Sequence, residues 1–188
     1  MIGYLKNLHG SKQKTKQKTK QKMETKIKEL RVSLDGLTQL VKTLEVSRER
    51  SLTITSLELS KMWLGKVLKE LGTTNPYPES KNPANEKIEP TADSHPGLVH
   101  SSINITEYQW KEFTHIQRVK FLRAEVEKVE KDLESLRDSV DIHKEILNNY
   151  SSKWKLAFLY NSFENCIEAG MWLGMELGAI RDKEVNNG

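Results

Sequence analysis

The chain has 188 residues, of which 36% are hydrophobic, so it is long enough for one domain with an apolar core or for two small ones. No apolar run approaches the roughly 20 residues of a membrane-spanning helix, and no apolar signal segment follows the N-terminus, so we expect a cytoplasmic protein without membrane contact. A single cysteine, Cys166, excludes an intramolecular disulfide framework and a cysteine-based zinc cluster, and its apolar neighbours favour a buried thiol.

The formal net charge of +4 is distributed unevenly. Residues 1–28 contain nine lysines and one acidic residue, whereas the remaining 160 residues carry 21 basic and 25 acidic side chains. Residues 11–22 follow a KQKT repeat without apolar residues, which predicts a solvated arm over residues 1–22, either disordered or a frayed helical extension. Two interpretations of the arm stay open: an electrostatic arm for RNA, DNA or an anionic ligand, with nucleic acid bound through residues 12–22, or a solubilising tail.

Apolar residues at steps of three and four predict four amphipathic helices. They cover residues 23–45, 48–71, 110–137 and 153–183. Ser47 is the expected N-cap of the second helix, Gly72 is its expected stop, and Thr106 is the expected cap before the third. Residues 138–152 either extend the third helix or form a bent connection.

The sequence Met-Trp-Leu-Gly occurs at residues 62–65 and again at 171–174. Because the chain contains only 5 methionines and 4 tryptophans, the repeat indicates an internal duplication of a helix. The first copy lies on a helix that is apolar on two sides, which predicts packing against the second unit or against other chains. The second copy lies among Gly170, Gly174 and Gly178, which predict close approach of another helix or, alternatively, of a ligand.

All five prolines lie between residues 73 and 107, together with many asparagines and serines. This composition predicts turns and short extended pieces, and the length is typical of a segment that wraps the surface and supplies binding groups. The predicted fold is therefore all-α, with two tandem helical hairpins joined by a Pro-rich loop and oligomerising into a helical bundle assembly. Its parts are the arm 1–22, the first hairpin 23–72, the connecting loop 73–107, the second hairpin 108–183 and the tail 184–188.

Local signatures of the common enzyme classes are missing. The five histidines are dispersed, and there is no His-Glu-x-x-His sequence, Gly-rich strand-to-helix loop or local serine-histidine-aspartate signature. Carboxylates of the third helix alternate with lysines, which favours a solvated, ion-paired surface over an acid/base pair. We therefore predict no catalytic residue, no metal site and no cofactor.

Two stretches resemble the phage helical-hairpin sponge family, which includes anti-CBASS and anti-Thoeris proteins. They are RERSLTITSLELSKMWLGKVLKELG with NPYPESKNPANEKIEPTAD, and TEYQWKEFTHIQRVKFLRAEVEKVEKDLESLR with KWKLAFLYNSFENCIEAGMWLG. The resemblance covers about 150 of the 188 residues, all but the lysine-rich arm. It implies a small hairpin that oligomerises, commonly as a hexamer, and that sequesters cyclic dinucleotides, cyclic trinucleotides or cyclised ADP-ribose without cleaving them.

In the anti-CBASS members, a Tyr before the first helix and a Lys within it contact the ligand between protomers. The resemblance places these roles at Tyr108 and Lys120 in the second unit, whereas in the first unit Lys28 is matched but only Tyr4 precedes it, across the lysine-rich insertion. Cations and an aromatic side chain near the helix starts add further candidates for phosphate and base contacts. They are Arg48, Arg50, Tyr77, Arg118 and Arg123, each of which is otherwise a surface cation or a loop-packing aromatic residue.

Three functional hypotheses follow. The first is a non-enzymatic phage sponge whose partners are cyclic nucleotide second messengers and further copies of itself, with three chains forming a pseudo-hexamer of hairpins. The second is a helical scaffold or nucleic-acid-associated protein that is anchored by the lysine-rich arm. The weakest is a hydrolase of such signals.

Overall fold

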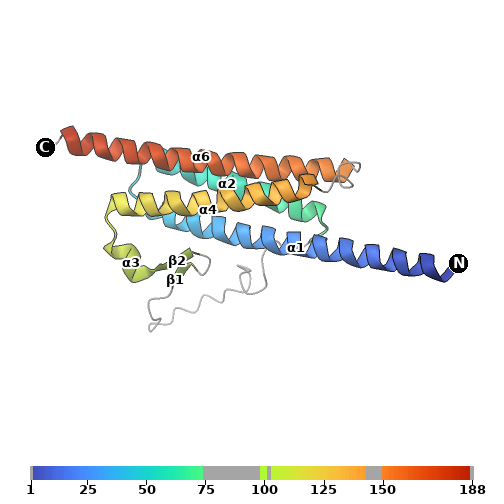
Figure 1. The fold of residues 1–188 in the computed structure, drawn as a ribbon. Coiled ribbons are helices and arrows are strands. Elements are labelled where there is room, and N and C mark those ends of the chain that lie inside the picture. The colour runs from blue at the N-terminus through green and yellow to red at the C-terminus, as the bar shows by residue number, and fades with distance from the viewer. Residues whose placement is uncertain (1, 74–97, 101–102, 143–149, 187–188) are drawn as a thin grey trace.

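Four long helices lie side by side in a bundle (Figure 1). The computed structural model describes residues 2–73, 98–100, 103–142 and 150–186. The long helices are α1 (Ile2–Lys42), α2 (Arg48–Glu70), α4 (His115–Ile142) and α6 (Tyr150–Asn186). The predicted helical fold is thus confirmed. No helix in the described ranges is long and apolar enough to cross a membrane.

Each long helix packs against two others, since α2 and α4 both contact α1 and α6. Figure 1 shows that α2 and α4 run in one direction and that α1 and α6 run in the other. Neighbouring helices are therefore antiparallel, as in up-and-down bundles. The end of α2 lies at the opposite end of the bundle from the start of α4, so the chain crosses the length of the bundle between them.

This connection carries a small hairpin and a short helix. Strands β1 (Leu98–His100) and β2 (Ile103–Thr106) pair antiparallel, with Leu98 opposite Thr106 and His100 opposite Ile103, and α3 (Glu107–Glu112) follows. The strands contact α1, and Ile103 and Ile105 are buried against the core. Short extended pieces were predicted here and are confirmed in these two strands. Residues 74–97, which contain all five prolines, lie outside the described residues.

The predicted third helix is wrong at its start, because the chain forms two helices where one was expected. Phe113 has an extended backbone (φ −69°, ψ 132°), and α4 begins after Thr114. Thr114 N donates to Gln117 Oε1 (2.8 Å), and Gln117 N donates to Thr114 Oγ1 (3.3 Å). This reciprocal capping box satisfies backbone groups that an unbroken helix would have bonded internally, and it repeats the box between Thr106 and Gln109.

The other predicted boundaries agree more closely with the structure. Ser47 caps α2 by accepting a hydrogen bond from Arg50 N (2.9 Å), and Gly72 has a positive φ of 78° after the last turn. The arm belongs to α1, which is one continuous helix from Ile2. Of the two predicted alternatives, disorder and a helical extension, the structure has the helical extension. Residues 143–149, part of the predicted extension or bend, lie outside the described residues.

The first helices of the two hairpins share a spacing that agrees with the predicted duplication. Six buried apolar residues along α1 and the turn that ends it follow the same steps of three and four as six on α4. They are Ile27, Leu30, Leu34, Leu37, Val41 and Leu44 in the first hairpin, and Val119, Leu122, Val126, Val129, Leu133 and Leu136 in the second. In this alignment Lys28 corresponds to Lys120, and Arg31 corresponds to Arg123.

The second helices of the two hairpins, α2 and α6, form the most extensive helix contact. Ser60 and Ser162 face each other in full burial: Ser60 Oγ donates to Ser162 O (2.8 Å), and Ser162 Oγ donates to Ser60 O (3.1 Å). Farther along, Trp63 stacks on Phe158 with ring centroids 5.6 Å apart. The second apolar side of α2 is therefore covered by the second unit of the same chain, one of the two alternatives that its sequence left open.

The repeated glycine of Met-Trp-Leu-Gly makes room for an arginine in each hairpin. A Cβ on Gly65 would clash with Nη1 of Arg31, which donates to Lys61 O (3.0 Å). A Cβ on Gly174 would lie 3.6 Å from the guanidinium of Arg123, an ordinary contact distance. The predicted close approach of another helix is confirmed at Gly174 and also at Gly170, which faces Glu130 and Val126 of α4.

The two motif glycines therefore give a matched pair of substitutions. We expect Gly65→Ala to unfold with a free energy roughly 1–2 kcal/mol below that of Gly174→Ala, because the new methyl group displaces a nine-tenths buried guanidinium only in the first hairpin. Urea unfolding followed by circular dichroism measures both. Equal stabilities would show that the Arg31 side chain moves aside without cost.

Glu130 lies beside the buried Cys166, and its surroundings disfavour the charged form of its carboxyl group. Burial and the nearby Glu127 carboxylate raise the pKa of Glu130 above 4.5, and burial together with Glu130 raises the pKa of the Cys166 thiol, which stays protonated. The predicted buried thiol is confirmed.

Replacing Glu130 tests this effect on the charged form through pH. Glu130 keeps its proton to higher pH in the folded chain than in the unfolded chain. The free energy of unfolding therefore falls as pH rises from the unfolded pKa of about 4.5 through the higher folded pKa, and it stays lower above the folded pKa. We expect Glu130→Gln to be more stable than the parent protein at pH 7 and to lose this advantage near pH 4, where both states are protonated. Urea unfolding at the two pH values checks the sign, and an advantage that does not change with pH would contradict it.

Candidate functional site

A serine, a histidine and a carboxylate come together where α2, α4 and α6 meet. Ser47 Oγ donates to Glu176 Oε2 (2.7 Å), and His115 Nε2 lies 3.3 Å from Glu176 Oε1. In a nucleophilic triad the histidine contacts the serine, whereas here the buried glutamate lies between them. The arrangement joins three helix segments, and we assign it a structural role.

Arg50 and Arg118 cap the helices that precede them. Arg50 donates from Nε to Val41 O (3.3 Å) and from Nη2 to Lys42 O (2.6 Å), at the end of α1. Arg118 donates from Nε to Trp110 O (3.0 Å) and from Nη2 to Lys111 O (3.1 Å), at the end of α3. These bonds add donors at carbonyls of helix ends, one of which, Val41 O, also accepts from Leu44 N (3.0 Å), so both candidate arginines contribute donors to the fold.

Lys28 and Arg123 also have neighbours within the bundle. Lys28 Nζ lies 2.8 Å from Glu24 Oε1, and this contact lowers the pKa of Glu24. Arg123 covers Gly174 with its guanidinium and lies near enough to Glu127 and Glu130 to favour their charged forms. Both side chains lie at the surface, and each already interacts with carboxylates of its own helix.

The remaining candidates are exposed or undescribed. Lys120 and Arg48 are exposed, and Tyr108 on α3 has 67% of its surface accessible. Tyr77 lies outside the described residues. Lys28 lies on α1 and Lys120 lies on α4, which run in opposite directions. The structure does not gather the predicted residues into one site.

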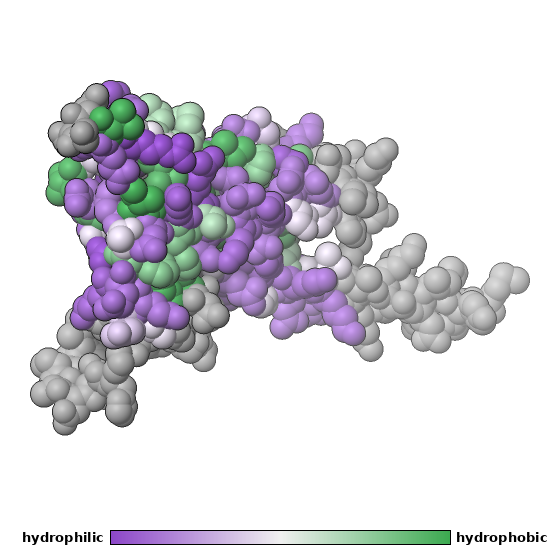
Figure 2. All heavy atoms as spheres, turned by 60° about the vertical axis from the view of Figure 1, so that its left-hand side comes forward, coloured by the Kyte–Doolittle hydropathy of each residue, from purple (hydrophilic) through white to green (hydrophobic). Residues whose placement is uncertain are grey.

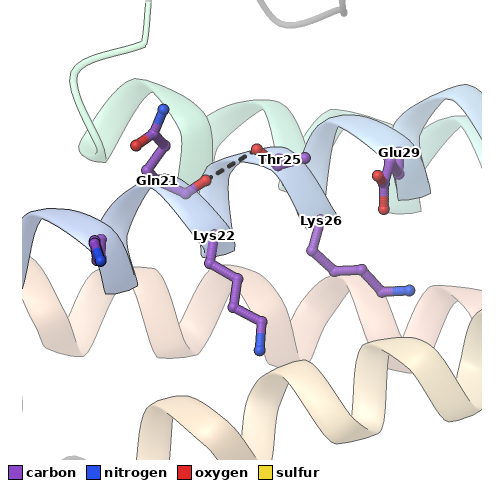
Figure 3. A pocket seen from close by; sticks show the side chains of 6 residues that line it. Gln21, Lys22, Thr25, Lys26 and Glu29 are labelled. Atoms are coloured by element: carbon purple, nitrogen blue, oxygen red, sulfur yellow. Dashed lines mark hydrogen bonds between the residues drawn. The ribbon is translucent and has the colours of Figure 1, made fainter.

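A separate group of cations lines a shallow, open depression on α1 (Figure 3). We call the lining of this depression the lysine face. It consists of three lysines and three other polar residues: Lys18, Gln21, Lys22, Thr25, Lys26 and Glu29. The three lysines are four residues apart, so they form a stripe with a spacing of about 6 Å along the helix. Figure 3 shows Lys22 and Lys26 extending in the same direction from α1.

The contacts of the lysine face divide it into a fixed end and an open end. Lys26 Nζ donates to Asp132 Oδ2 of α4 (2.7 Å), which holds α1 and α4 together. Lys18 and Lys22 are exposed, and Thr25 Oγ1 donates to Gln21 O (3.0 Å). The exposed ammonium groups of Lys18 and Lys22 are donors for phosphate oxygens, whereas the single proton of the Thr25 hydroxyl is used within α1. The site can therefore hold an anion by several hydrogen bonds, with Glu29 as the acidic residue at its edge.

Sequence reasoning recognised the lysines as an arm but missed the face that they share with residues 25–29. The signal was the four-residue lysine period that continues from the KQKT repeat through Lys26. The predicted arm ended at residue 22, so the predicted boundary separated Lys26 from Lys18 and Lys22.

Comparison of the chain with protein-family models, with curated proteins and with solved structures found no match. A functional conclusion therefore rests on the residues of this chain.

Arg48 and Arg50 are a matched pair that separates a capping role from a surface role. We expect Arg50→Ala to lower the free energy of unfolding by about 1 kcal/mol, because Lys42 O loses its donor, whereas Val41 O keeps its hydrogen bond from Leu44 N (3.0 Å). The exposed Arg48→Ala should stay within about 0.5 kcal/mol of the parent protein. Chemical denaturation measures both, and equal losses would contradict the capping role.

Proposed function

We propose that this chain is a non-enzymatic binder of phosphate-bearing nucleotides, acting as a phage anti-defence sponge that sequesters cyclic oligonucleotide signals. The lysine face of α1 is the observation that supports anion binding most directly, since it presents the exposed ammonium groups of Lys18 and Lys22 along one shallow depression. The resemblance of both hairpins to the sponge family supports the cyclic nucleotide as ligand class. Sequestration requires affinity and no chemical step.

The lysine face suits a multiply charged ligand better than a single small anion. One exposed ammonium–anion contact contributes little in water, because solvent and salt screen it. Several lysines at a regular spacing act together on a ligand that carries several phosphates, and a cyclic oligonucleotide has two or three of them in one rigid ring. A preorganised ring also loses little conformational entropy on binding.

Binding of nucleic acid is the second candidate, favoured by the shape of α1. Its N-terminal part extends past the other helices as a continuous helix (Figure 1). Residues 2–22 contain seven lysines and no acidic residue. Lysine occupies every second position from residue 12 to residue 22. Such a rod suits the phosphate backbone of a nucleic acid, which is bound without regard to sequence.

Substitution of the lysine face tests the proposed function. The variant Lys18→Gln/Lys22→Gln is compared with Lys128→Gln/Lys131→Gln, which removes the same charge from exposed positions on α4. Calorimetry uses cyclic dinucleotides, cyclic trinucleotides and cyclised ADP-ribose isomers as ligands. We expect the α1 variant to bind about tenfold more weakly and the α4 variant to bind as the parent protein does.

Three further measurements separate the alternatives. Deletion of residues 1–16 keeps Lys18 and Lys22, so a sponge retains its cyclic ligand. A nucleic-acid binder instead loses affinity for a DNA duplex, and its salt slope becomes shallower by about 0.9 for each phosphate that the shortened arm no longer neutralises. Lys120→Ala reduces ligand binding only if the site lies where the resemblance puts it. Recovery of intact nucleotide after incubation excludes hydrolysis, and absence of binding to every cyclic ligand would reject the sponge.

A further inference from the structure

The outer side of α6 carries apolar side chains that the bundle does not cover. Figure 2 shows hydrophobic residues scattered among polar ones on one face of the molecule. On α6, the side chains of Tyr160, Ile167, Met171 and Met175 have 40–51% of their surface exposed. The last three follow Tyr160 by about two, three and four helical turns, so the four side chains form one stripe. The residues by which α6 packs on the bundle, among them Ser162, Cys166 and Leu173, lie on the opposite side of the helix.

The stripe continues to Gly178, where no close contact with another described segment requires a glycine. Gly178 lies five turns after Tyr160, and among the described residues no atom of another segment lies within 4 Å of where its Cβ would be. A glycine inside a helix is less favourable than alanine by roughly 1 kcal/mol. Gly170 has a close neighbour in Glu130 of α4, and Gly174 has Arg123 of α4 at an ordinary contact distance, whereas Gly178 faces outward. A helix that approaches from outside would explain a small residue at this position.

The charges on the stripe are self-complementary. It begins at Lys153 and ends at Asp182, both of which are exposed. Two copies of α6 aligned antiparallel about a point between Ile167 and Glu168 bring each lysine opposite the aspartate of the other copy. The same alignment pairs small with small and aromatic with thioether side chains. The facing residues are Lys153 and Asp182, Ala157 and Gly178, Tyr160 and Met175, Glu164 and Met171, and Ile167 and Glu168.

We propose that α6 is a homodimerisation surface on which the same stripe of a second copy packs antiparallel. A two-fold axis brings one patch onto itself, so facing features must be symmetric about one point; the charged ends, the small residues and the Tyr160–Met175 pair are symmetric here, whereas Met171 and Ile167 face glutamates. Tyrosine and methionine are enriched at protein interfaces, and a sulfur atom packs favourably against an aromatic ring. The two lysine–aspartate contacts lie about 44 Å apart and fix the register.

The second copy suits this surface better than a foreign helix does. A foreign partner would have to reproduce the positive end, the small residue and the negative end in reverse order, whereas a copy of α6 carries them by construction. The glutamate on the stripe fits this arrangement, because Glu164 accepts a hydrogen bond from Tyr160 that raises the pKa of the phenol. Its carboxylate is therefore held along its own helix, beside the facing Met171.

Charge reversal tests the dimer and its register without ligand, so the result is independent of the proposed function. Sedimentation equilibrium gives the molar mass and the dissociation constant of the full chain. Lys153→Glu and Asp182→Lys should each weaken the dimer about tenfold, because each replaces two attractive contacts by repulsive ones. The double variant should regain most of the parent affinity, since both contacts are restored with the charges exchanged.

Two controls complete the experiment. Lys183→Glu makes a charge reversal one residue away from Asp182, off the stripe, and should leave dimerisation unchanged. Met171→Glu should abolish the dimer while circular dichroism and thermal unfolding remain as in the parent protein, because this side chain is half exposed. A monomer or a trimer in the parent protein overturns the proposal, and so does a dimer in which the double charge reversal fails to restore affinity.

Discussion

The reciprocal contact between Ser60 and Ser162 sets the spacing and register of the central helix pair. Both hydroxyls are fully buried, and each donates to the backbone carbonyl of the other helix. A buried hydroxyl without a partner costs about 1–3 kcal/mol, so sliding α2 along α6 by one turn would leave two such groups unsatisfied. Serine is also small enough to let the two backbones approach. The outward faces of α2 and α6 and the positions of their Met-Trp-Leu-Gly segments follow from this register.

The helices could be predicted because their apolar residues repeat with the period of a helix, and Ser47 and Gly72 act locally on the backbone. The break before α4 was missed because Trp110, Phe113 and Ile116 continue the apolar period through it. All three pack against the core, so hydrophobic spacing alone cannot distinguish one helix from two. The distinguishing signal was chemical, a second Thr-x-x-Gln sequence that begins at Thr114.

The candidate site was harder to predict than the fold, because residue type does not reveal what a cation faces. Arg50 and Arg118 have the composition of phosphate ligands, but the ends of α1 and α3 place carbonyl groups within their reach. The lysine face depends on a period that was visible and on the position of Asp132, more than a hundred residues later, which was not. Tertiary neighbours thus decide which positive side chains remain available to a ligand.

The crossing between α2 and α4 has a consequence for the order of folding. Within each hairpin the contacts join segments close in sequence, whereas Ser60 and Ser162 are 102 residues apart. Closing a long loop costs more entropy than closing a short one, so we expect each hairpin to begin ordering before the two dock. Until docking, the apolar side of α2 that receives α6 is exposed to water. A nascent chain therefore carries its first hairpin with one apolar face uncovered until its last helix has been synthesised.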